Sequence, residues 1–320
     1  VLRAFASFGF CKAHAAAFAL PTYQSAWLKT HYPAAFLAGV LTHDPGMYPK
    51  RLIVDEARQM GIAIAPLDVN ASDSVYRVED HGNAIRIALS TVAGISDGEV
   101  QSIIAGRPYI DLNDFVRRSG SSTPVTESMI LTGAFDALHA DVNRRDLLLH
   151  FSDLQKSPST AVSGAQMNLG FEPPALISSG LPAMTPAESV KYEVDRLGID
   201  MSRHMIEFYG DFLNAIGAVR SSDLLKQRSQ SSVLVAGIKV AMQTPPVRSG
   251  KRVIFVTLDD GYGLSDSTFF TDVQGEYANV LYSTSLLLVR GVTRRTGARG
   301  ISIRATGAWD LRAAYESWST

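Results

Sequence analysis

Two cationic side chains near the start of the chain, Lys12 and His14, are the first candidates for chemistry. They lie two positions apart after Gly9, in a glycine-broken aromatic turn that leads into an Ala-rich stretch. A cation presented on such a turn can form charge-assisted hydrogen bonds with a phosphate group. The alternative is a solvated lysine and a packed histidine at a helix start, since isolated basic residues usually belong to the surface. The spacing alone leaves both interpretations open.

A second set of cations and aromatic rings lies between residues 233 and 320, where ten Lys and Arg stand against seven Asp and Glu. Cations would pair with phosphates, and exposed rings would stack on bases at ~1–3 kcal/mol each. Alternatively, Phe255 and Phe269 or Phe270 fill a core while the cations protect strand edges. We expect the rings inside strands to be mostly core, and Tyr262, in a turn, to be the stacking residue. The predicted DNA contacts of this region are Arg248, Lys251, Arg252, Tyr262, Arg294 and Arg295.

Two glycine-containing turns, each next to a helical pattern, suggest a duplicated helix-hairpin-helix. Such a motif sets backbone N–H groups at a helix N-terminus against a DNA phosphate without reading bases. Gly94 and Ser96 belong to the first turn and Gly133 to the second. Asp97 and Glu99 would repel a phosphate, so a simple packed helical hairpin remains the alternative.

Catalytic signatures are scarce in the sequence. The adjacent carboxylates Asp259 and Asp260 precede Gly261-Tyr262-Gly263 and are more typical of a hairpin turn than of a metal site. Nucleotidyl transfer by two metal ions needs acidic groups that bind both ions, ~3.5–4 Å apart. No phosphate-binding loop, Ser-His-Asp arrangement or Cys/His metal spacing occurs. We therefore predict no metal ligand and no catalytic residue in this sequence.

Composition sets further limits. The chain of 320 residues has 46% hydrophobic and 19% charged residues, which is ordinary globular composition, and its net charge of −1 means that any DNA contact must be local. A single cysteine excludes a disulfide framework and fits a reducing, cytoplasmic environment. The N-terminal stretch could be mistaken for a secretory signal, but Lys12 and His14 interrupt it. No apolar run reaches the ~18 residues of a membrane span.

The pattern of the chain predicts an α+β multidomain protein. Helices are expected at 13–42, with Pro21 and Pro33 as kink and boundary, at 51–60, and at roughly 186–218; a small hairpin is expected at 76–87. Residues 157–186 are rich in Ser, Pro and Gly and indicate a linker. From residue 232, five short strands with a helix between the third and fourth predict an OB-fold barrel.

Four segments resemble bacterial C-family DNA polymerases, the DNA polymerase III alpha subunits. The stretch FASFGFCKAHAAAFALPTYQSAWLKTHYPAAFLAGVLT is similar to their fingers region, although Cys11 and Ala13 differ from the Asn and Ser usual in replicative members. Three more resemble the error-prone, ImuC-type branch: DPGMYPKRLIVDEARQMGIAIAPLDVN, LGIDMSRHMIEFYGDFLNAIGAV and QTPPVRSGKRVIFVTLDD.

The resemblance implies an order of domains. It implies the end of the fingers at 1–75, a tandem helix-hairpin-helix at 76–156, a linker with a helical segment at 157–231, an OB-fold at 232–313 and a tail at 314–320. Lys12 and His14 would then contact the incoming nucleotide or template. The catalytic carboxylates and their Mg²⁺ would lie N-terminal to this chain, which by itself should be inactive.

The resemblance also implies partners. These are primer-template and single-stranded DNA and, in some members, accessory mutagenesis proteins. Gln166, Met167, Leu169 and Phe171 resemble the peptide by which bacterial polymerases dock on the sliding clamp. Three alternatives stay open: a replicative rather than error-prone parent, a free-standing DNA-binding protein, and a module for clamp or partner docking.

Overall fold

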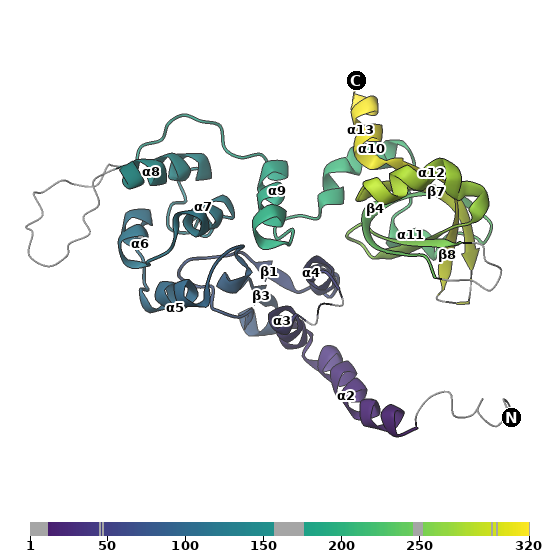
Figure 1. Ribbon diagram of the computed structural model, residues 1–320, viewed down its shortest axis with the longest axis horizontal. Coiled ribbons are helices and arrows are strands. Elements are labelled where there is room, and N and C mark those ends of the chain that lie inside the picture. The colour runs from purple at the N-terminus through teal and green to yellow at the C-terminus, as the bar shows by residue number, and fades with distance from the viewer. Residues whose placement is uncertain are drawn as a thin grey trace, which may run out of the picture. The chain divides into compact units, whose positions relative to one another are not determined.

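The chain forms two compact units, residues 1–199 and residues 200–320, in a computed structural model. The described residues are 12–44, 46, 48–156, 176–245, 252–295, 297–298 and 300–319. The first unit is mainly helical, and the second contains a β-barrel (Figure 1). This division agrees with the predicted fold class. No helix in the described residues combines the length and apolar character needed to cross a membrane.

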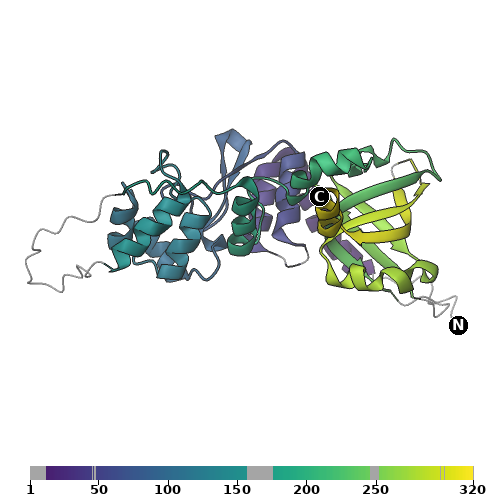
Figure 2. The ribbon, with the colours of Figure 1, turned by 90° about the horizontal axis from the view of Figure 1, so that it is seen from above.

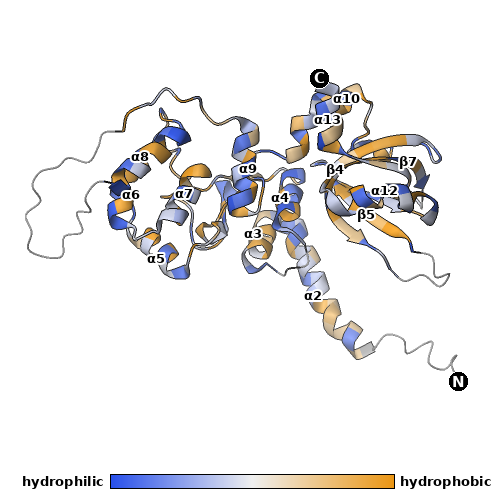
Figure 3. Ribbon diagram, turned by 45° about the horizontal axis from the view of Figure 1, so that its top comes forward, coloured by the Kyte–Doolittle hydropathy of each residue, from blue (hydrophilic) through white to orange (hydrophobic). Residues whose placement is uncertain are grey.

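Three helices open the first unit: α2 (Lys12–His31), α3 (Pro33–His43) and α4 (Lys50–Gln59). Pro33 is the first residue of α3, a position that suits a residue without an N–H, so the predicted boundary is confirmed. Pro21 lies inside α2. Most side chains of α2 are exposed, apolar ones included. Figure 3 colours parts of this helix orange, the colour of hydrophobic residues. Gly61, in the left-handed region at φ +79°, follows α4 as expected.

A small sheet follows, built from β1 (Ala63–Ala65), β2 (Arg77–Glu79) and β3 (Ala84–Arg86) in the order β1-β3-β2. The antiparallel pair β2 and β3 confirms the predicted hairpin, with the short helix η2 (Asp80–Gly82) in its turn. The Glu79 carboxylate accepts hydrogen bonds from Arg86 Nε at 2.9 Å and Nη2 at 2.6 Å. These bonds fix the end of the hairpin.

A helical bundle comes next. Its members are η3 (Leu89–Thr91), α5 (Asp97–Ala105), α6 (Leu112–Arg118), α7 (Thr123–Leu131), α8 (Arg144–Lys156) and α9 (Pro186–Leu197). Three buried aromatic rings pack in its core, with Phe115 between Tyr109 and Phe135. In both pairs the ring centres are 5.0 Å apart and the ring planes are steeply inclined to each other. Gly198, at φ +70°, ends α9. The segment at roughly 186–218, expected to be helical, therefore consists of separate helices, because a left-handed glycine interrupts it.

The second unit begins with η4 (Met205–Tyr209), α10 (Gly210–Ala215) and α11 (Ser221–Leu224). The barrel then consists of β4 (Ser232–Gln243), β5 (Ile254–Asp259), β6 (Leu264–Phe269), α12 (Thr271–Ser283), β7 (Leu286–Arg295) and β8 (Ile301–Asp310). The strands form a closed barrel (Figure 2). Their order is β4-β5-β6-β8-β7, and the β6–β8 pair is parallel. This order, with the helix between the third and fourth strands, is the predicted OB-fold.

The barrel core consists of the alternate, inward-facing side chains of its strands. Val233, Val256, Phe269, Val289 and Ile303 are all at most 5% exposed. The last helix, α13 (Leu311–Ser319), occupies much of the segment expected to be a tail. Its residues Leu311 and Tyr315 pack with Phe212 of α10 in a second apolar cluster. The helix therefore belongs to the folded unit.

Candidate nucleic-acid interface

A row of outward-facing side chains crosses four barrel strands at the end that leads into the β4–β5 loop. The strand register pairs Gln243 with Phe255, Phe255 with Thr268, and Thr268 with Arg304. We call these four residues the barrel row. It combines an aromatic ring and a cation, the groups that hold a single nucleic-acid strand, with a hydroxyl and an amide.

Phe255 is the aromatic member of the barrel row and is 41% exposed. Its neighbours Ile254 and Val256 are buried, and successive strand residues face opposite sides, so the ring points away from the core. The expectation that rings inside strands are core holds for Phe269, which is fully buried, but is wrong for Phe255. The barrel therefore presents a ring on its surface.

The predicted basic residues of the barrel have different surroundings. Arg252 and Arg294 are exposed. Arg295 donates from its guanidinium to the carbonyl oxygens of Leu225 and Gln227, so it holds the loop before β4. Arg248 and Lys251 lie outside the described residues. Arg252 and Arg294 consequently remain the better candidates for phosphate contact.

Tyr262, predicted to stack on a base, lies in the β5–β6 turn and is 46% exposed. The guanidinium of Arg220 lies over its ring, 4.4 Å from the ring centre. One face of the ring is therefore already covered by a cation–π contact. A base could stack only on the other face.

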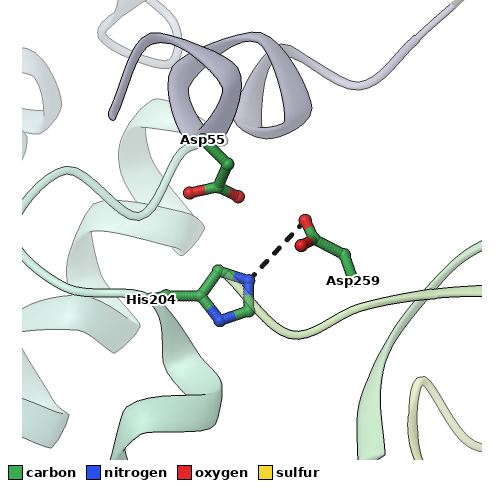
Figure 4. Close-up of side chains that lie close together, drawn as sticks. All are labelled: Asp55, His204 and Asp259. Atoms are coloured by element: carbon green, nitrogen blue, oxygen red, sulfur yellow. Dashed lines mark ion pairs between the residues drawn. The ribbon is translucent and has the colours of Figure 1, made fainter. Parts of the chain in front are cut away.

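The turn itself is a hairpin, as expected for Asp259 and Asp260. Asp260 accepts hydrogen bonds from the Ser221 N–H at 2.7 Å and from the Tyr262 N–H at 3.0 Å. The Asp259 Oδ2 lies 3.7 Å from the Nε2 of His204, and both side chains are buried (Figure 4). These carboxylates organise the turn and its attachment to the residues before β4.

The first predicted hairpin precedes α5. Gly94 has a left-handed backbone at φ +81°, which favours glycine. Ser96 and Glu99 form a capping box: the Glu99 N–H donates to Ser96 Oγ at 3.2 Å, and the Ser96 N–H donates to Glu99 Oε2 at 2.9 Å. Hydrogen bonds from Ser122 and Ser96 lower the pKa of Glu99 to about 2. A phosphate at this helix end would meet a carboxylate that is already bound there.

The second hairpin precedes α8. Gly133 has φ +86°, and the Arg144 guanidinium covers it, because a Cβ there would lie 2.7 Å from Arg144 Cζ. Arg144 in turn donates to the Asp136 carboxylate, at 2.6 Å for the Nη2–Oδ2 pair. The Asp146 N–H donates to Asn143 Oδ1 at 3.0 Å, which caps α8. Gly133 is thus required for a packed turn.

Most arginines of the bundle also have internal partners. Arg107 donates to the carbonyl oxygens of Val69 and Ser72. Arg118 donates to Asp114 from Nε at 2.6 Å, and hydrogen bonds from Arg118 are the main cause of the lowered pKa of the Asp114 carboxyl. Most of the positively charged side chains of this segment are therefore engaged by partners within the fold.

The other predicted contacts lie at the edges of the described chain. Lys12 is the first residue of α2, and its side chain lies outside the described residues. His14 is exposed, so it is not the packed histidine of the alternative interpretation; its ring lies 4.5 Å from that of Phe18. The clamp-peptide residues Gln166, Met167, Leu169 and Phe171 lie outside the described residues.

The potential metal-binding side chains of each unit do not come together in one site among the described residues. Within the described residues of either unit taken alone, no three His, Cys, Asp or Glu side chains come close enough to hold an ion. The residues present within a unit therefore do not fit a two-metal site for nucleotidyl transfer, and no step of that reaction is assigned to them.

Comparisons with known proteins agree with this arrangement. The family model of a helix-hairpin-helix motif matches residues 61–147. The error-prone DNA polymerase of Symbiobacterium thermophilum is 31% identical over 94% of this chain and 32% of its own length. The DNA polymerase III subunit alpha of Escherichia coli K12 is 30% identical over 100% of this chain and 29% of its own length.

This chain is homologous to a region of the C-family DNA polymerases. The similarity extends over nearly the whole chain, but the chain spans only about a third of the length of these relatives. The error-prone DNA polymerase of Rhodopirellula baltica is 32% identical over 91% of the chain. Both branches of the C-family polymerases thus match at similar identity.

Solved structures match smaller parts of the chain. The mitochondrial single-stranded DNA-binding protein Rim1 of S. cerevisiae is 14% identical, with a TM-score of 0.21, over 26% of this chain and 97% of that one.

Sequence reasoning missed two features of the barrel row, Gln243 and the outward direction of Phe255. The strict alternation of buried Ile254, Val256 and Leu258 was the signal that could have revealed that direction.

Proposed function

We propose that this chain is the DNA-holding region of an error-prone C-family DNA polymerase. The observation that carries the proposal is the exposed ring of Phe255 on the barrel row, with the exposed cation Arg304 two strands away. The exposed part of this ring gains no free energy from burial in the core. Its face can instead stack on a nucleotide base.

The barrel would bind the single-stranded template. Phe255 stacks on one base, while Arg252, Arg294 and the predicted Arg248 and Lys251 pair with phosphates. Since each phosphate contact releases a counterion, affinity falls steeply with salt concentration. The helix-hairpin-helix residues Gly94, Ser96 and Gly133 would lie along duplex DNA, and a phosphate at the first hairpin competes with the capping carboxylate of Glu99.

The first helix would serve the incoming nucleotide through Lys12 and His14. Nucleotidyl transfer itself, with its Mg²⁺, would take place on carboxylates of the polymerase other than those described here. The error-prone assignment rests on the three segments similar to that branch and on error-prone relatives at 31% and 32% identity. A replicative parent is the competing assignment.

Clamp docking is a separate proposal that concerns Gln166, Met167, Leu169 and Phe171. The test is binding of the full chain to the sliding clamp and to single-stranded DNA, before and after replacing Gln166 and Leu169 by Ala. Loss of clamp binding with unchanged DNA binding supports direct docking. If the unaltered chain does not bind the clamp, direct docking through these residues is rejected.

The central experiment is fluorescence-anisotropy titration of the chain with a labelled single-stranded oligonucleotide and a primer-template, across a series of salt concentrations. We expect dissociation constants of about 1 μM or below at low salt, with a log–log slope that counts phosphate contacts. Phe255→Ala should weaken single-strand binding by about 5- to 150-fold. Absence of binding at low salt would falsify the DNA-holding role of this region.

A further inference from the structure

A groove of about 570 Å³ lies beside the barrel row. It is bounded by the ends of β6 and β7, the start of β8, the first turn of α12 and the loop before β4. The residues that matter for its chemistry are Phe270, Arg294, Arg304, Gln230, Thr268 and Ser302. Its size falls within the ~300–1,000 Å³ of sites for small organic molecules.

The groove exists because β6 and β8 separate quickly. Their register pairs only Ser267 with Ile303 and Thr268 with Arg304 in the described strands. After Phe269 the chain turns into α12, and Phe270 precedes the first helical residue. Thr268 and Arg304 belong to both the barrel row and the groove, so a strand lying on the row reaches the groove directly.

An aromatic ring with a cation beside it lies in the groove. Phe270 is 37% exposed, and the Arg304 guanidinium carbon lies 5.5 Å from the centre of its ring. Arg294, the second cation, is exposed on β7. Thr268 and Ser302 add hydroxyl groups. A base needs a ring for stacking, its phosphate needs a cation, and its edge and sugar need polar partners.

The loop on the far side of the groove is held in an unusual conformation. Gln230 has φ +66°, a left-handed backbone that is unfavourable for a non-glycine residue. Its N–H donates to Thr293 O at 2.8 Å, and the Ser231 N–H donates to Thr293 Oγ1 at 3.0 Å. Arg295 secures the same loop through Leu225 and Gln227. These contacts fix the backbone of Gln230, an amide-bearing residue that lines the groove.

One carboxylate opposes anion binding here. Asp272 Oδ2 lies 3.2 Å from Arg304 Nη2, and both side chains are more than half exposed. An exposed ion pair of this kind is weak, so a phosphate can displace Asp272 from Arg304. The pair holds Arg304 over Phe270 while no strand is bound.

We propose that this groove is a pocket for one unstacked nucleotide of a single DNA strand. Phe270 stacks on the base with the ring face that Arg304 does not cover, Arg294 and Arg304 pair with the flanking phosphates, and Gln230 contacts the edge of the base. The inference rests on the proposed DNA-holding function and adds a second stacking position, next to that of Phe255. The strand therefore turns from the barrel row into the groove.

The test combines Phe270→Ala with oligonucleotides of ~10 nucleotides, within the range that one OB-fold covers. A single abasic residue is placed at each position in turn, and binding to the full chain is measured by anisotropy. We expect Phe270→Ala to weaken binding of the intact oligonucleotide by about 5- to 150-fold. At one position, the penalty of the abasic residue should disappear in this variant, because the ring and the base act as one contact.

Three controls accompany the test. Tyr282→Ala removes an exposed ring of α12 that does not line the groove and should leave binding unchanged. Phe270→Tyr keeps the π-face and should bind as the unaltered chain does, which separates stacking from folding. Asp272→Asn should tighten binding by a few-fold, because it frees Arg304.

The outcomes distinguish the two proposals. If Phe255→Ala weakens binding but Phe270→Ala does not, the barrel holds DNA and the groove is not part of the path. If the abasic penalty persists at every position in Phe270→Ala, the ring does not stack on a base and the pocket is rejected. If the unaltered chain binds no single strand, both proposals fail together.

Discussion

The guanidinium of Arg220 and the ring of Tyr262 form a cation–π pair, with 4.4 Å between the guanidinium carbon and the ring centre. The Asp260 carboxylate, beside Tyr262, accepts from the N–H of Ser221, the residue after Arg220. The β5–β6 turn is therefore attached to the start of α11 at two adjacent positions. Tyr262 has a structural role that its place in a turn did not reveal.

We expect Tyr262→Ala to affect single-strand binding much less than Phe255→Ala. One face of the Tyr262 ring already contacts Arg220, and Tyr262 lies outside the barrel row, whereas Phe255 is a member of that row and is 41% exposed. Tyr262→Ala should stay within about twofold, against about 5- to 150-fold for Phe255→Ala. Anisotropy with the same oligonucleotide measures both. A larger loss of affinity for Tyr262→Ala would mean that the DNA strand contacts the β5–β6 turn and not the barrel row.

The neighbours Arg294 and Arg295 should separate binding from stability. Arg294→Ala should reduce the salt dependence of DNA binding by about one phosphate contact and leave the urea midpoint unchanged. Arg295→Ala should lose about 1 kcal/mol of unfolding free energy, because its hydrogen bonds to Leu225 and Gln227 are removed. Paired titrations and urea unfolding test this. The reverse pattern would exchange the roles of the two arginines.

Glu99 should make the first hairpin sensitive to acid. Its pKa of about 2 in the folded chain lies below the ordinary 4.5, and the main cause is its hydrogen bonds with Ser122. The stabilisation is fully present above the ordinary pKa and is lost as pH falls toward 2. The difference in melting temperature between the unaltered chain and Glu99→Gln should therefore be constant above pH ~5 and shrink below pH ~4.5.

Other carboxylates also titrate in this range, so only the difference between the two proteins is informative. The matched control is Glu276→Gln in α12, where no comparable set of backbone donors is present among the described contacts. This variant reports the effect of removing an exposed carboxylate that caps no helix. A Glu99 difference that grew as the pH fell would contradict the assignment.

Gly261 should be intolerant of substitution. It has φ +81°, and a Cβ at this position would lie 2.8 Å from the His204 ring. We expect Gly261→Ala to cost about 2 kcal/mol or more, from the left-handed backbone and the steric overlap. Gly275→Ala, inside α12 with open space around its Cβ position, should instead stabilise by about 0.5–1 kcal/mol. Urea unfolding of both variants measures the contrast.

The barrel was predictable because strand alternation is a local signal. Ile254, Val256 and Leu258 are buried at every second position of β5, which is the period of a half-buried strand. That same period requires Phe255 to face outward. Its assignment to the core was an error of weighting, since aromatic rings favour burial in general. Local pattern thus contained both the fold and the direction of its exposed ring.

Hydrogen bonds between residues far apart in the sequence could not be predicted. Arg295 bonds to residues 68 and 70 positions earlier, and Asp260 accepts from Ser221, 39 positions earlier. No periodicity links such pairs, so Arg295 resembled any exposed cation. The break at Gly198 was also missed, because the residues on both sides favour helices and only the left-handed backbone separates them.

The short β6–β8 pairing has a consequence for how DNA and the barrel influence each other. Two paired positions, Ser267–Ile303 and Thr268–Arg304, form the narrowest seam of the described barrel. Local opening favours the site with the fewest backbone bonds, so amide hydrogen exchange should be fastest there. A DNA strand that contacts both Thr268 and Arg304 bridges β6 and β8 and stabilises their pairing. Ligand binding and barrel closure are then one linked equilibrium.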